Sequence, residues 1–440
     1  MTAKRKSSLN KKLLFAVLAG LSIGLIVGED SVALFLKEFV VLGVLNVIGQ
    51  IFLRILSMLS IPVIMITLIN GIARIGDIKN VGKIGGKIFS YYLLTTFLAS
   101  VMAIIFALIF VPGNQVVPEI TKEITLQTPA FAKTLINIIP ENPFKSLNSG
   151  NLLPLIVFAV LIGISISMLG KKVSSTINLL YQFNKLVLKM FQIVMGFAPL
   201  GVFALVINVF VQEGFDTYIE VYKYFILIIL LLCLQFFGIY GFIVKYMIKA
   251  DFSIFIRKFR AIALTSFATS SSNACIPVTM FAVRYKYGVS RKISSAVIPL
   301  GTVINMDGTA IMQSVAVLFI AQMYNVHFSL SNMILLVLYI IISTFGTAGI
   351  PGAGIISLGV ILTVFKLPLS GIAIILSVDR LLDMVRTVVN VAGDTVGAVL
   401  IAKSENEWNV DIYNNPDSGS DDSLTFEQLQ QDIIEHKSKN

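Results

Sequence analysis

Hydrophobic residues form long runs along most of the chain. Six runs cover residues 13–28, 45–68, 91–111, 152–169, 191–211 and 224–244. Their lengths are close to the roughly 20 residues that an α-helix needs to cross the hydrocarbon core of a bilayer. The pattern therefore predicts an all-α integral membrane protein rather than a soluble one.

The charged residues between these runs predict how the helices are oriented. Lysine and arginine cluster in residues 74–87, 171–172 and 245–260, whereas acidic residues occur around 119–141 and 213–220. Because basic loops stay on the cytoplasmic side, the alternation indicates six spans that start from a cytoplasmic N-terminus. The run at 13–28 also follows basic residues, as a signal peptide does, but no A-x-A-like cleavage site comes after it. We expect this run to be retained as the first span.

Residues 261–283 break the alternation. The segment is apolar at both ends and polar in the middle, where residues 270–277 read Ser-Ser-Ser-Asn-Ala-Cys-Ile-Pro. Basic residues flank it on both sides, at 257–260 and 284–292. Both ends are therefore expected on the cytoplasmic face, which predicts a re-entrant hairpin. Such a tip is tolerated at membrane depth only inside protein or beside a water-filled cavity.

A second interruption follows a seventh span. Residues 333–342 are apolar, the glycine-rich residues 346–354 break the helix, and residues 355–365 are apolar again. An ordinary loop is the alternative, and a nucleotide-binding loop is disfavoured because no strand precedes it. Each interruption is followed by a helix with ionisable groups, and paired broken segments are typical of transporter binding sites. The prediction is eight transmembrane helices plus two re-entrant helical hairpins, arranged as inverted repeats.

The last helix, residues 378–394, carries the strongest signal. Its polar residues are Asp379, Asp383, Arg386, Thr387, Asn390 and Asp394. At about 100° per residue they fall within an arc of about 100°, with Arg380 just beyond its edge. A narrow polar stripe on an apolar helix is expected to face a bundle interior or an aqueous cavity. The alternative is an ion-pair network that only holds helices together.

The side chains of this stripe suggest a ligand. The forked guanidinium of Arg386 matches a carboxylate, and the carboxylate of Asp383 matches an ammonium group. Asn390 can meet a second carboxylate, so an acidic α-amino acid fits the set. A C4-dicarboxylate has no nitrogen and would leave Asp383 unpaired. Asp394, with Asn305 and Asp307 in the preceding helix, supplies oxygen ligands suited to a small hard cation such as sodium.

Composition and charge exclude several classes of function. Of 440 residues, 56% are hydrophobic and 13% are charged, and the net charge is +10. The basic residues lie in short loops between the runs, which argues against nucleic-acid binding. Cys233 and Cys275 form no metal or disulfide pattern, and no nucleophile with a partner base indicates an enzyme. Residues 404–440 are acidic and polar and predict a disordered cytoplasmic tail.

Several motifs together resemble the dicarboxylate/amino acid:cation symporter family, to which glutamate and aspartate transporters belong. They are the Asn-Met-Asp-Gly-Thr sequence at 305–309, the stripe at 383–394, the serine tip, the Gly-Ile-Pro-Gly-Ala-Gly sequence at 349–354 and the Tyr-Tyr-Leu-Leu-Thr-Thr sequence at 91–96. The resemblance implies a homotrimer in the plasma or inner membrane. It also implies a static scaffold, about residues 13–80 and 150–215, and a transport domain that slides like an elevator, about residues 81–112 and 222–403.

The resemblance also implies the binding residues. Substrate-binding positions would be Ser270, Ser271, Ser272, Thr309, Ile350, Gly354, Asp383, Arg386, Thr387 and Asn390. One sodium ion would bind Tyr92, Thr95, Thr96, Asn305 and Asp307, and a second would bind Gly301, Asn305, Asn390 and Asp394. A third would bind backbone carbonyls near Val303, Thr344, Phe345 and Thr347. No cofactor is expected besides these coupling ions.

The chain departs from the family pattern at some positions. Archaeal aspartate carriers have an arginine where Ser270 stands, and animal glutamate carriers have one where Met384 stands. Gln313 stands where potassium-countertransporting relatives have a glutamate. Proton-coupled bacterial relatives often have asparagine at the position of Asp394, so the aspartate here favours sodium. The sequence therefore predicts sodium-coupled uptake of glutamate or aspartate. C4-dicarboxylate, cystine or proton-coupled glutamate symport are the alternatives, and a channel would not need Asp383 and Arg386 placed for one zwitterionic solute.

Overall fold

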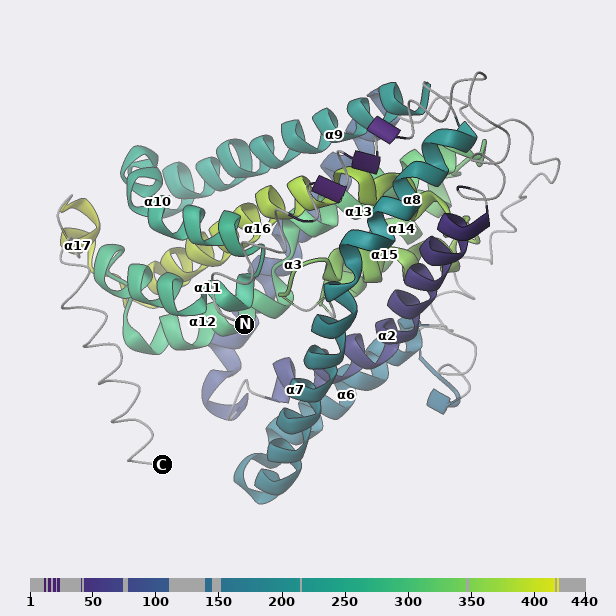
Figure 1. The fold of residues 1–440 in the computed structure, drawn as a ribbon. Coiled ribbons are helices and arrows are strands. Elements are labelled where there is room, and N and C mark those ends of the chain that lie inside the picture. The colour runs from purple at the N-terminus through teal and green to yellow at the C-terminus, as the bar shows by residue number, and fades with distance from the viewer. Residues whose placement is uncertain are drawn as a thin grey trace.

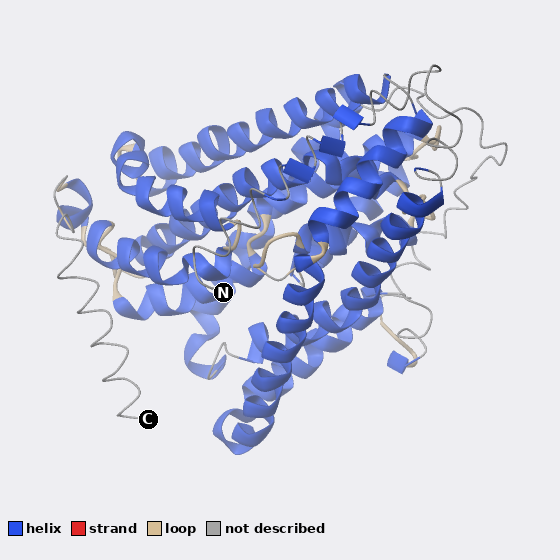
Figure 2. Ribbon diagram, viewed as in Figure 1, coloured by secondary structure: helices blue, strands red, loops and turns tan. Residues whose placement is uncertain are grey.

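The part of the chain that the structure describes is helical. The computed structural model describes residues 12, 15–16, 19–20, 22–23, 41, 43–73, 78–110, 139–144, 152–213, 216–345, 347, 349–415 and 418. Within these residues there is no strand, and one isolated bridge joins Val289 to Trp408 (Figure 2). The predicted all-α class is confirmed. Most of the predicted first span, residues 13–28, lies outside the described residues.

The helices follow one another in the order shown in Figure 1. They are α2 (Asn46–Ala73), α3 (Ile78–Phe110), α6 (Leu152–Leu169), α7 (Ser174–Gly196), α8 (Ala198–Glu213), α9 (Asp216–Cys233), α10 (Phe252–Thr269), α11 (Ser272–Phe281), α12 (Arg291–Ile304), α13 (Asp307–Met323), α14 (Leu330–Phe345), α15 (Ala353–Val364), α16 (Gly371–Ser404) and α17 (Val410–Asn414). A short 3-10 turn, η2 (Gly170–Val173), precedes α7. Three π-helical turns, η3 (Leu234–Tyr240), η4 (Ile243–Ile248) and η5 (Ala282–Lys286), extend α9 and α11.

Three described stretches are long and apolar enough to cross a membrane. They are Ile84–Phe110, Ile219–Ile248 and Arg291–Met323. The first two expose large apolar side chains such as Leu94, Ile109 and Phe237, as expected of a surface that faces lipid, whereas the third is almost wholly buried. The predicted run at 191–211 is divided between α7 and α8. The break falls at Phe197, two residues before Pro199, because proline has no N–H to continue the hydrogen bonds of α7 but is tolerated in the first turn of α8.

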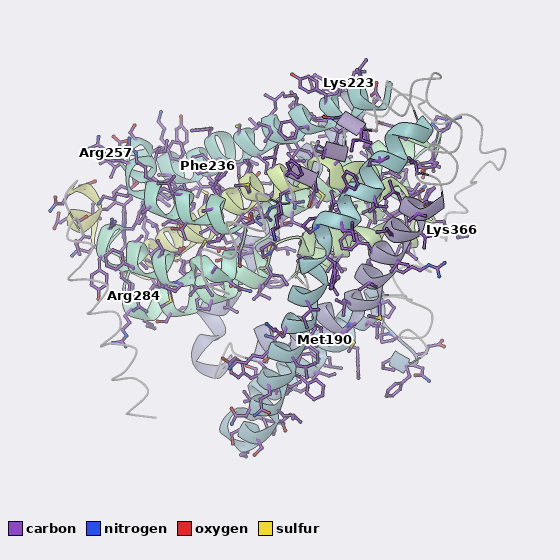
Figure 3. The ribbon with its side chains drawn as sticks, in the orientation of Figure 1. Met190, Lys223, Phe236, Arg257, Arg284 and Lys366 are labelled. Carbon is purple, nitrogen blue, oxygen red and sulfur yellow. The ribbon has the colours of Figure 1, made fainter. Side chains whose placement is uncertain are left out.

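The serine-rich interruption forms a helix–turn–helix. The chain turns back at Ser270, whose backbone has a left-handed φ of 47°, and Ser271 caps α11 by accepting a hydrogen bond from the amide of Ala274. As a result α10 and α11 pack against each other. Figure 3 places Arg257 of α10 and Arg284 of η5 at the same end of the bundle. The two flanks of the segment therefore lie on one side, near α17.

The glycine-rich interruption forms a second helix pair, α14 and α15. Gly352, just before α15, has a φ of +78°, which a residue with a side chain rarely adopts. The tips of the two pairs touch each other: the amide of Asn273 donates to the carbonyl of Gly349 over 3.1 Å, and Ser271 Oγ donates to the same carbonyl over 2.7 Å. Segments about 80 residues apart in sequence are joined at this point.

The long helix α16 runs through the middle of the bundle, where it packs against α10, α12, α13 and α3 (Figure 1). The backbone between α12 and α13 leaves the helical path at Asn305 and Met306, beside α16. One large apolar cluster joins α3 and the helices from α9 to α16, and it includes buried side chains of α2, α7 and α8 as well. A smaller cluster joins α2 and α6, and partly buried side chains of α7, α14 and α15 pack against it. The break and the two tips thus surround one central helix.

The chain after α16 folds back onto the first helix pair. Trp408 Nε1 donates to the carbonyl of Tyr287 over 2.9 Å, and Lys258 Nζ donates to the carbonyls of Ile412 and Tyr413 over 2.9 and 2.7 Å. Within the predicted tail, residues 405–415 pack against the first helix pair, because their carbonyls and aromatic rings find partners there. Residues 419–440 lie outside the described part of the chain.

A glycine on α16 allows close packing against α3. A Cβ atom built on Gly397 would lie 2.6 Å from Cε1 of Tyr91, whereas a Cβ atom on Gly86 would meet nothing within 4 Å. Gly397→Ala should therefore lower the free energy of unfolding by about 1–3 kcal/mol through overpacking. Gly86→Ala should raise it by about 0.5–1 kcal/mol, because alanine loses less backbone entropy in a helix. Denaturant unfolding of the purified protein measures both, and equal stability of the two variants would contradict this packing.

Candidate functional site

The polar stripe of α16 faces the interior, as the sequence predicts. Its members Asp379, Asp383, Arg386, Thr387, Asn390 and Asp394 are all buried. The guanidinium-bearing side chain of Arg386 is only 1% exposed. A charge at this depth is costly unless opposite charges and hydrogen bonds surround it. The stripe therefore requires partners for each of its ionised groups.

Arg386 has two carboxylate partners on its own helix. Its Nη2 donates to Asp383 Oδ1 over 2.7 Å and lies 3.0 Å from Asp379 Oδ1. The Nε and Nη1 atoms have no hydrogen-bond partner within the described residues. Nη1 points toward the second tip, since a Cβ atom on Gly354 would lie 3.4 Å from it. A guanidinium has five N–H donors, so Arg386 keeps donors for one more carboxylate.

Asp383 joins the stripe to the second tip. Its Oδ2 accepts a hydrogen bond from the amide of Gly352 over 3.1 Å, and it lies 3.5 Å from Nη1 of Arg380. Asp383 thus has an arginine on each side, at positions 380 and 386. Sequence analysis left Arg380 outside the site because it lies just beyond the arc. Its length lets it reach the carboxylate, and its position next to the stripe was the available signal.

Asn390 connects α16 to the start of α13. Its Oδ1 accepts from the amide of Gly308 over 2.8 Å, and its Nδ2 lies 3.5 Å from Oγ1 of Thr309. Thr387 Oγ1 donates to the backbone carbonyl of Asp383 over 2.7 Å, so this hydroxyl hydrogen points toward the preceding turn of α16. The break before α13 therefore places Thr309, a predicted substrate-binding residue, next to the stripe.

The two tips close over these residues. A Cβ atom on Gly354 would lie 3.1 Å from Cγ2 of Thr309, so the second tip contacts both Thr309 and Arg386. The predicted tip residues Ser270, Ser272 and Ile350 lie at the joined tips, where both serines are buried. Ser270 Oγ has no hydrogen-bond partner within the described residues. The residues predicted to bind substrate thus gather on α16, at the start of α13 and at the two tips.

The residues predicted to bind cations form a second group beside the first. Thr96 Oγ1 donates to Asp307 Oδ1 over 2.6 Å. Asn305 Nδ2 donates to Asp394 Oδ1 and to the carbonyl of Asn390, each over 2.9 Å. The break between α12 and α13 again supplies the contact, because Asn305 sits at that break.

Three further predicted positions join this group. A Cβ atom on Gly301 would lie 2.2 Å from Asp394 Oδ1 and 2.5 Å from Oη of Tyr92, so only glycine fits between them. Tyr92 donates to the carbonyl of Val297 over 3.2 Å. Thr95 is buried one turn further along α3, and its hydroxyl donates to the carbonyl of Tyr92 over 3.3 Å.

The oxygen atoms of this group lack positive partners. Asp307 and Asp394 are both fully buried, and neither pairs with a lysine or arginine in the described part of the chain. Asn305 Oδ1 and Asp394 Oδ2 have no hydrogen-bond donor there either. Buried acceptors without donors favour a bound cation, and carboxylate, amide and hydroxyl oxygens suit a hard one.

The third predicted cation position uses carbonyl groups at helix ends. Val303 lies in the last turn of α12, and Thr344 and Phe345 lie in the last turn of α14, with Thr347 just beyond it. The last four carbonyls of a helix have no partner within that helix and carry the negative end of its dipole. These carbonyls are therefore chemically suited to a cation.

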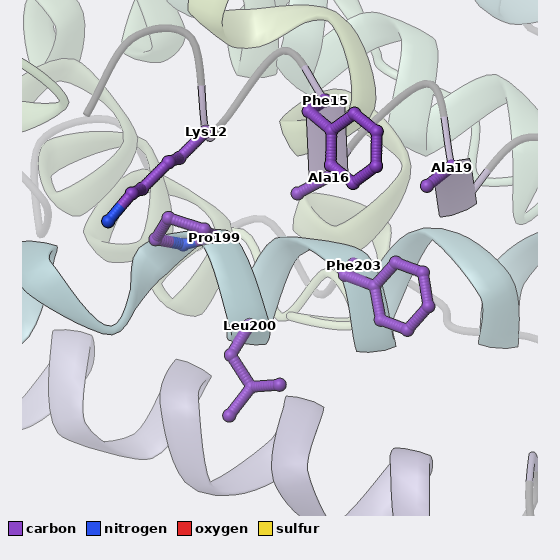
Figure 4. Close-up of a pocket in the computed structure, with 7 residues that line it drawn as sticks. All are labelled: Lys12, Phe15, Ala16, Ala19, Pro199, Leu200 and Phe203. Atoms are coloured by element: carbon purple, nitrogen blue, oxygen red, sulfur yellow. The ribbon is translucent and has the colours of Figure 1, made fainter. Parts of the chain in front are cut away.

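A groove of about 470 Å³ lies elsewhere, on the outside of α8 (Figure 4). It is lined by Lys12, Phe15, Ala16, Ala19, Pro199, Leu200 and Phe203. None of the predicted site residues lines it, and its side chains are mainly apolar. The groove belongs to the outer surface and not to the polar centre around α16.

Comparison with known proteins agrees with this geometry. The chain is 32% identical over 407 residues to the proton/sodium-glutamate symport protein of Bacillus caldotenax, covering 90% of this chain and 95% of the relative. It is 31% identical over 419 residues to the proton/glutamate-aspartate symporter of Escherichia coli, covering 92% and 94%. It is 32% identical over 379 residues to the C4-dicarboxylate transport protein of Rhodospirillum rubrum, covering 83% and 84%.

These relatives match over nearly their whole lengths, so the similarity includes both helix pairs and the stripe of α16. Residues 9–404 also match the model of a single family, whose description combines a cation with a dicarboxylate. A buried arginine can pair with a dicarboxylate, and buried oxygens without donors can bind a cation, so the geometry is compatible with this description. The chain belongs to the sodium:dicarboxylate symporter family.

Proposed function

We propose that the protein is a secondary active transporter that takes up L-glutamate or L-aspartate together with sodium ions. The observation that carries the proposal is the contact of Arg386 Nη2 with Asp383 Oδ1 over 2.7 Å, deep inside the bundle. Two opposite charges lie side by side and face the second tip. An acidic amino acid carries an ammonium group that can pair with Asp383 and a side-chain carboxylate that can pair with Arg386, so it can pair with both residues at once.

The substrate groups can be assigned to residues. The side-chain carboxylate would bind the free donors of Arg386, and the ammonium group would bind Asp383. The main-chain carboxylate would lie near Asn390 and Thr309, where amide and hydroxyl donors gather. Because Asp383 also accepts a hydrogen bond from Gly352, an ammonium group at Asp383 would affect the second tip directly. This contact makes the second tip the gate of the proposed transporter.

Sodium is the proposed coupling ion because of the donor set around Asp307 and Asp394. Asp307 and Asp394 are two buried carboxylates that pair with no lysine or arginine in the described part of the chain, so one proton would neutralise only one of them. A sodium ion can contact several oxygens at once. The relatives named above include proton/sodium as well as proton carriers, and proton-coupled glutamate symport is the alternative within the same reaction.

The two groups of residues share Asn390, and this explains how ion and substrate binding would be linked. The Asn390 carbonyl accepts from Asn305, a proposed cation ligand, while its side chain lies next to Thr309, a proposed substrate ligand. A cation that orders Asn305 therefore also orders Asn390. Such a shared element gives a coupling free energy that acts equally in both directions.

We further propose eight transmembrane helices with two re-entrant hairpins, α10–α11 and α14–α15, as inverted repeats. Arg257 and Arg284 at one end of the bundle support re-entry of the first pair. The packing of α2 against α6, α7 and α8 supports a scaffold, about residues 13–80 and 150–215, beside a moving transport domain, about residues 81–112 and 222–403. The proposal includes elevator motion, a homotrimer and a plasma or inner membrane location with both termini in the cytoplasm.

A C4-dicarboxylate is the second candidate substrate, because Arg380 lies 3.5 Å from Asp383. If a dicarboxylate took Arg386, Asp383 would still have Arg380 as a partner, which reduces the cost of the missing ammonium group. A relative from Rhodospirillum rubrum is named as a C4-dicarboxylate transport protein. A cystine carrier is a further alternative with the same charges and a larger solute. We favour the amino acid because it satisfies both Asp383 and Arg386 without moving Arg380.

Ion coupling can be measured with the protein reconstituted into sealed vesicles. An inward sodium gradient should drive accumulation of labelled L-glutamate, and replacing sodium with choline should abolish it. A pH gradient without sodium should drive none, because a proton binds one oxygen, whereas the buried oxygens around Asp307 and Asp394 suit a cation that contacts several at once. Uptake that follows the pH gradient and is indifferent to sodium would show that the proposed ion is wrong.

The arginine of the stripe can be tested by substitution. Arg386→Ala should raise the KM for L-glutamate by at least about 100-fold, since removing one partner of a buried ion pair costs about 3–5 kcal/mol. The variant should admit a neutral amino acid such as L-serine better than the unaltered protein does, because no guanidinium then demands a carboxylate. Arg257→Ala, at an exposed position of α10, is the matched control and should leave uptake unchanged. Wild-type affinity in Arg386→Ala would refute the assignment.

A further inference from the structure

Two buried polar side chains in η3, the turn that extends α9, lie outside every set predicted from the sequence. Gln235 and Tyr240 belong to the π-helical turn η3 and are both 0% exposed. Both occur inside the apolar run at 224–244, where a glutamine side chain is costly to bury. A buried amide that is kept in such a run needs a specific partner.

The partner of both side chains is Asp307. Gln235 Nε2 donates to Asp307 Oδ2 over 3.0 Å, and Tyr240 Oη donates to the same oxygen over 2.7 Å. The other carboxylate oxygen, Oδ1, accepts from Thr96 over 2.6 Å. The two oxygens of Asp307 therefore have different neighbours: Oδ2 faces α9, and Oδ1 faces Thr96 on α3.

The π-helical turn is what brings the two donors together. In an α-helix, residues five positions apart point about 140° away from each other, since each residue turns by about 100°. In a turn closed by hydrogen bonds between residues five apart, such positions lie on the same side. The wider turn thus directs Gln235 and Tyr240 at one oxygen atom. π-Helical turns are rare and are frequently found at functional sites.

Tyr240 also touches the second proposed cation group. A Cβ atom on Gly393 would lie 2.5 Å from Oη of Tyr240 and 2.4 Å from Nδ2 of Asn305. The tyrosine hydroxyl therefore lies close to Asn305, which donates to Asp394. The second amide atom of Gln235, Oε1, is buried without a hydrogen-bond partner in the described part of the chain. These contacts place both residues directly behind the cation ligands.

We propose that Gln235 and Tyr240 are positioning residues for a sodium ion bound at Asp307. They hold Oδ2 and so fix the plane of the carboxylate, which leaves Oδ1 directed toward Thr96 on α3. Hydrogen bonds to a ligand carboxylate orient it, and losing such a partner lowers metal affinity about 10-fold to 100-fold. The inference rests on the proposed sodium coupling and adds two residues that set its affinity.

The test compares single hydroxyl deletions in the reconstituted full-length protein. Tyr240→Phe should raise the sodium concentration for half-maximal uptake of L-glutamate about tenfold. At saturating sodium, its KM for L-glutamate should stay within about twofold of the unaltered value, because Tyr240 does not touch the substrate group. Tyr91→Phe is the matched control: its hydroxyl is also buried beside α16 but donates to the carbonyl of Gly393 and not to Asp307. It should leave sodium dependence unchanged.

A second variant and a second readout distinguish a loss of sodium affinity from a loss of folding or of transport. Gln235→Met keeps the length of the side chain and removes its donor, and it should shift sodium dependence in the same direction. The sodium-dependent rise in Tm of the purified protein should need correspondingly more sodium in both variants, with no transport required. Wild-type sodium dependence in Tyr240→Phe and Gln235→Met, or an equal shift in Tyr91→Phe, would overturn the inference. Sodium-independent uptake by the unaltered protein would overturn the proposed function itself.

Discussion

The structure depends on the pairing of Arg386 with Asp383 and Asp379 along one buried face of α16. A guanidinium at this depth is tolerated only because two carboxylates lie within 3.0 Å of its Nη2 atom. In the proposed transporter, the same pairing lets this face of α16 bind a charged solute. A molecule that carries a carboxylate and an ammonium group can exchange one set of ion pairs for another without leaving a buried charge alone. Selectivity then follows from charge balance and not from shape alone.

The breaks in the surrounding helices serve this face. A continuous helix would satisfy its own backbone groups and offer none to a ligand, whereas the tips at Ser270 and Gly352 and the break at Asn305 bring free backbone and short polar side chains to α16. The hydrogen bond from Ser271 to Gly349 joins the two tips to each other. The hydrogen bond from Gly352 to Asp383 joins the second tip to the charged face. The proposed ion binding, substrate binding and closure of the second tip would therefore act on neighbouring atoms.

Much of this arrangement could be predicted from the sequence, because charges inside apolar runs are rare and have few explanations. The stripe of α16, the serine tip and the residues at 305–309 all stand out by polarity. Gln235 and Tyr240 did not stand out, because a π-helical turn changes which positions share a face. No residue pattern predicts such a turn. The packing of residues 405–415 could not be predicted from composition, which reports average polarity, because it depends on specific acceptors for Lys258 and on a ring contact between Trp408 and Tyr413.

The central claim is that the charged face of α16 is built for a solute with both charges. The most direct measurement is competition against labelled L-glutamate uptake in sodium, with L-aspartate and succinate as competitors of nearly equal size. The account predicts that L-aspartate competes at least about tenfold better, since only its ammonium group can pair with Asp383, and 1.4 kcal/mol corresponds to a factor of ten. Equal or stronger competition by succinate would contradict it.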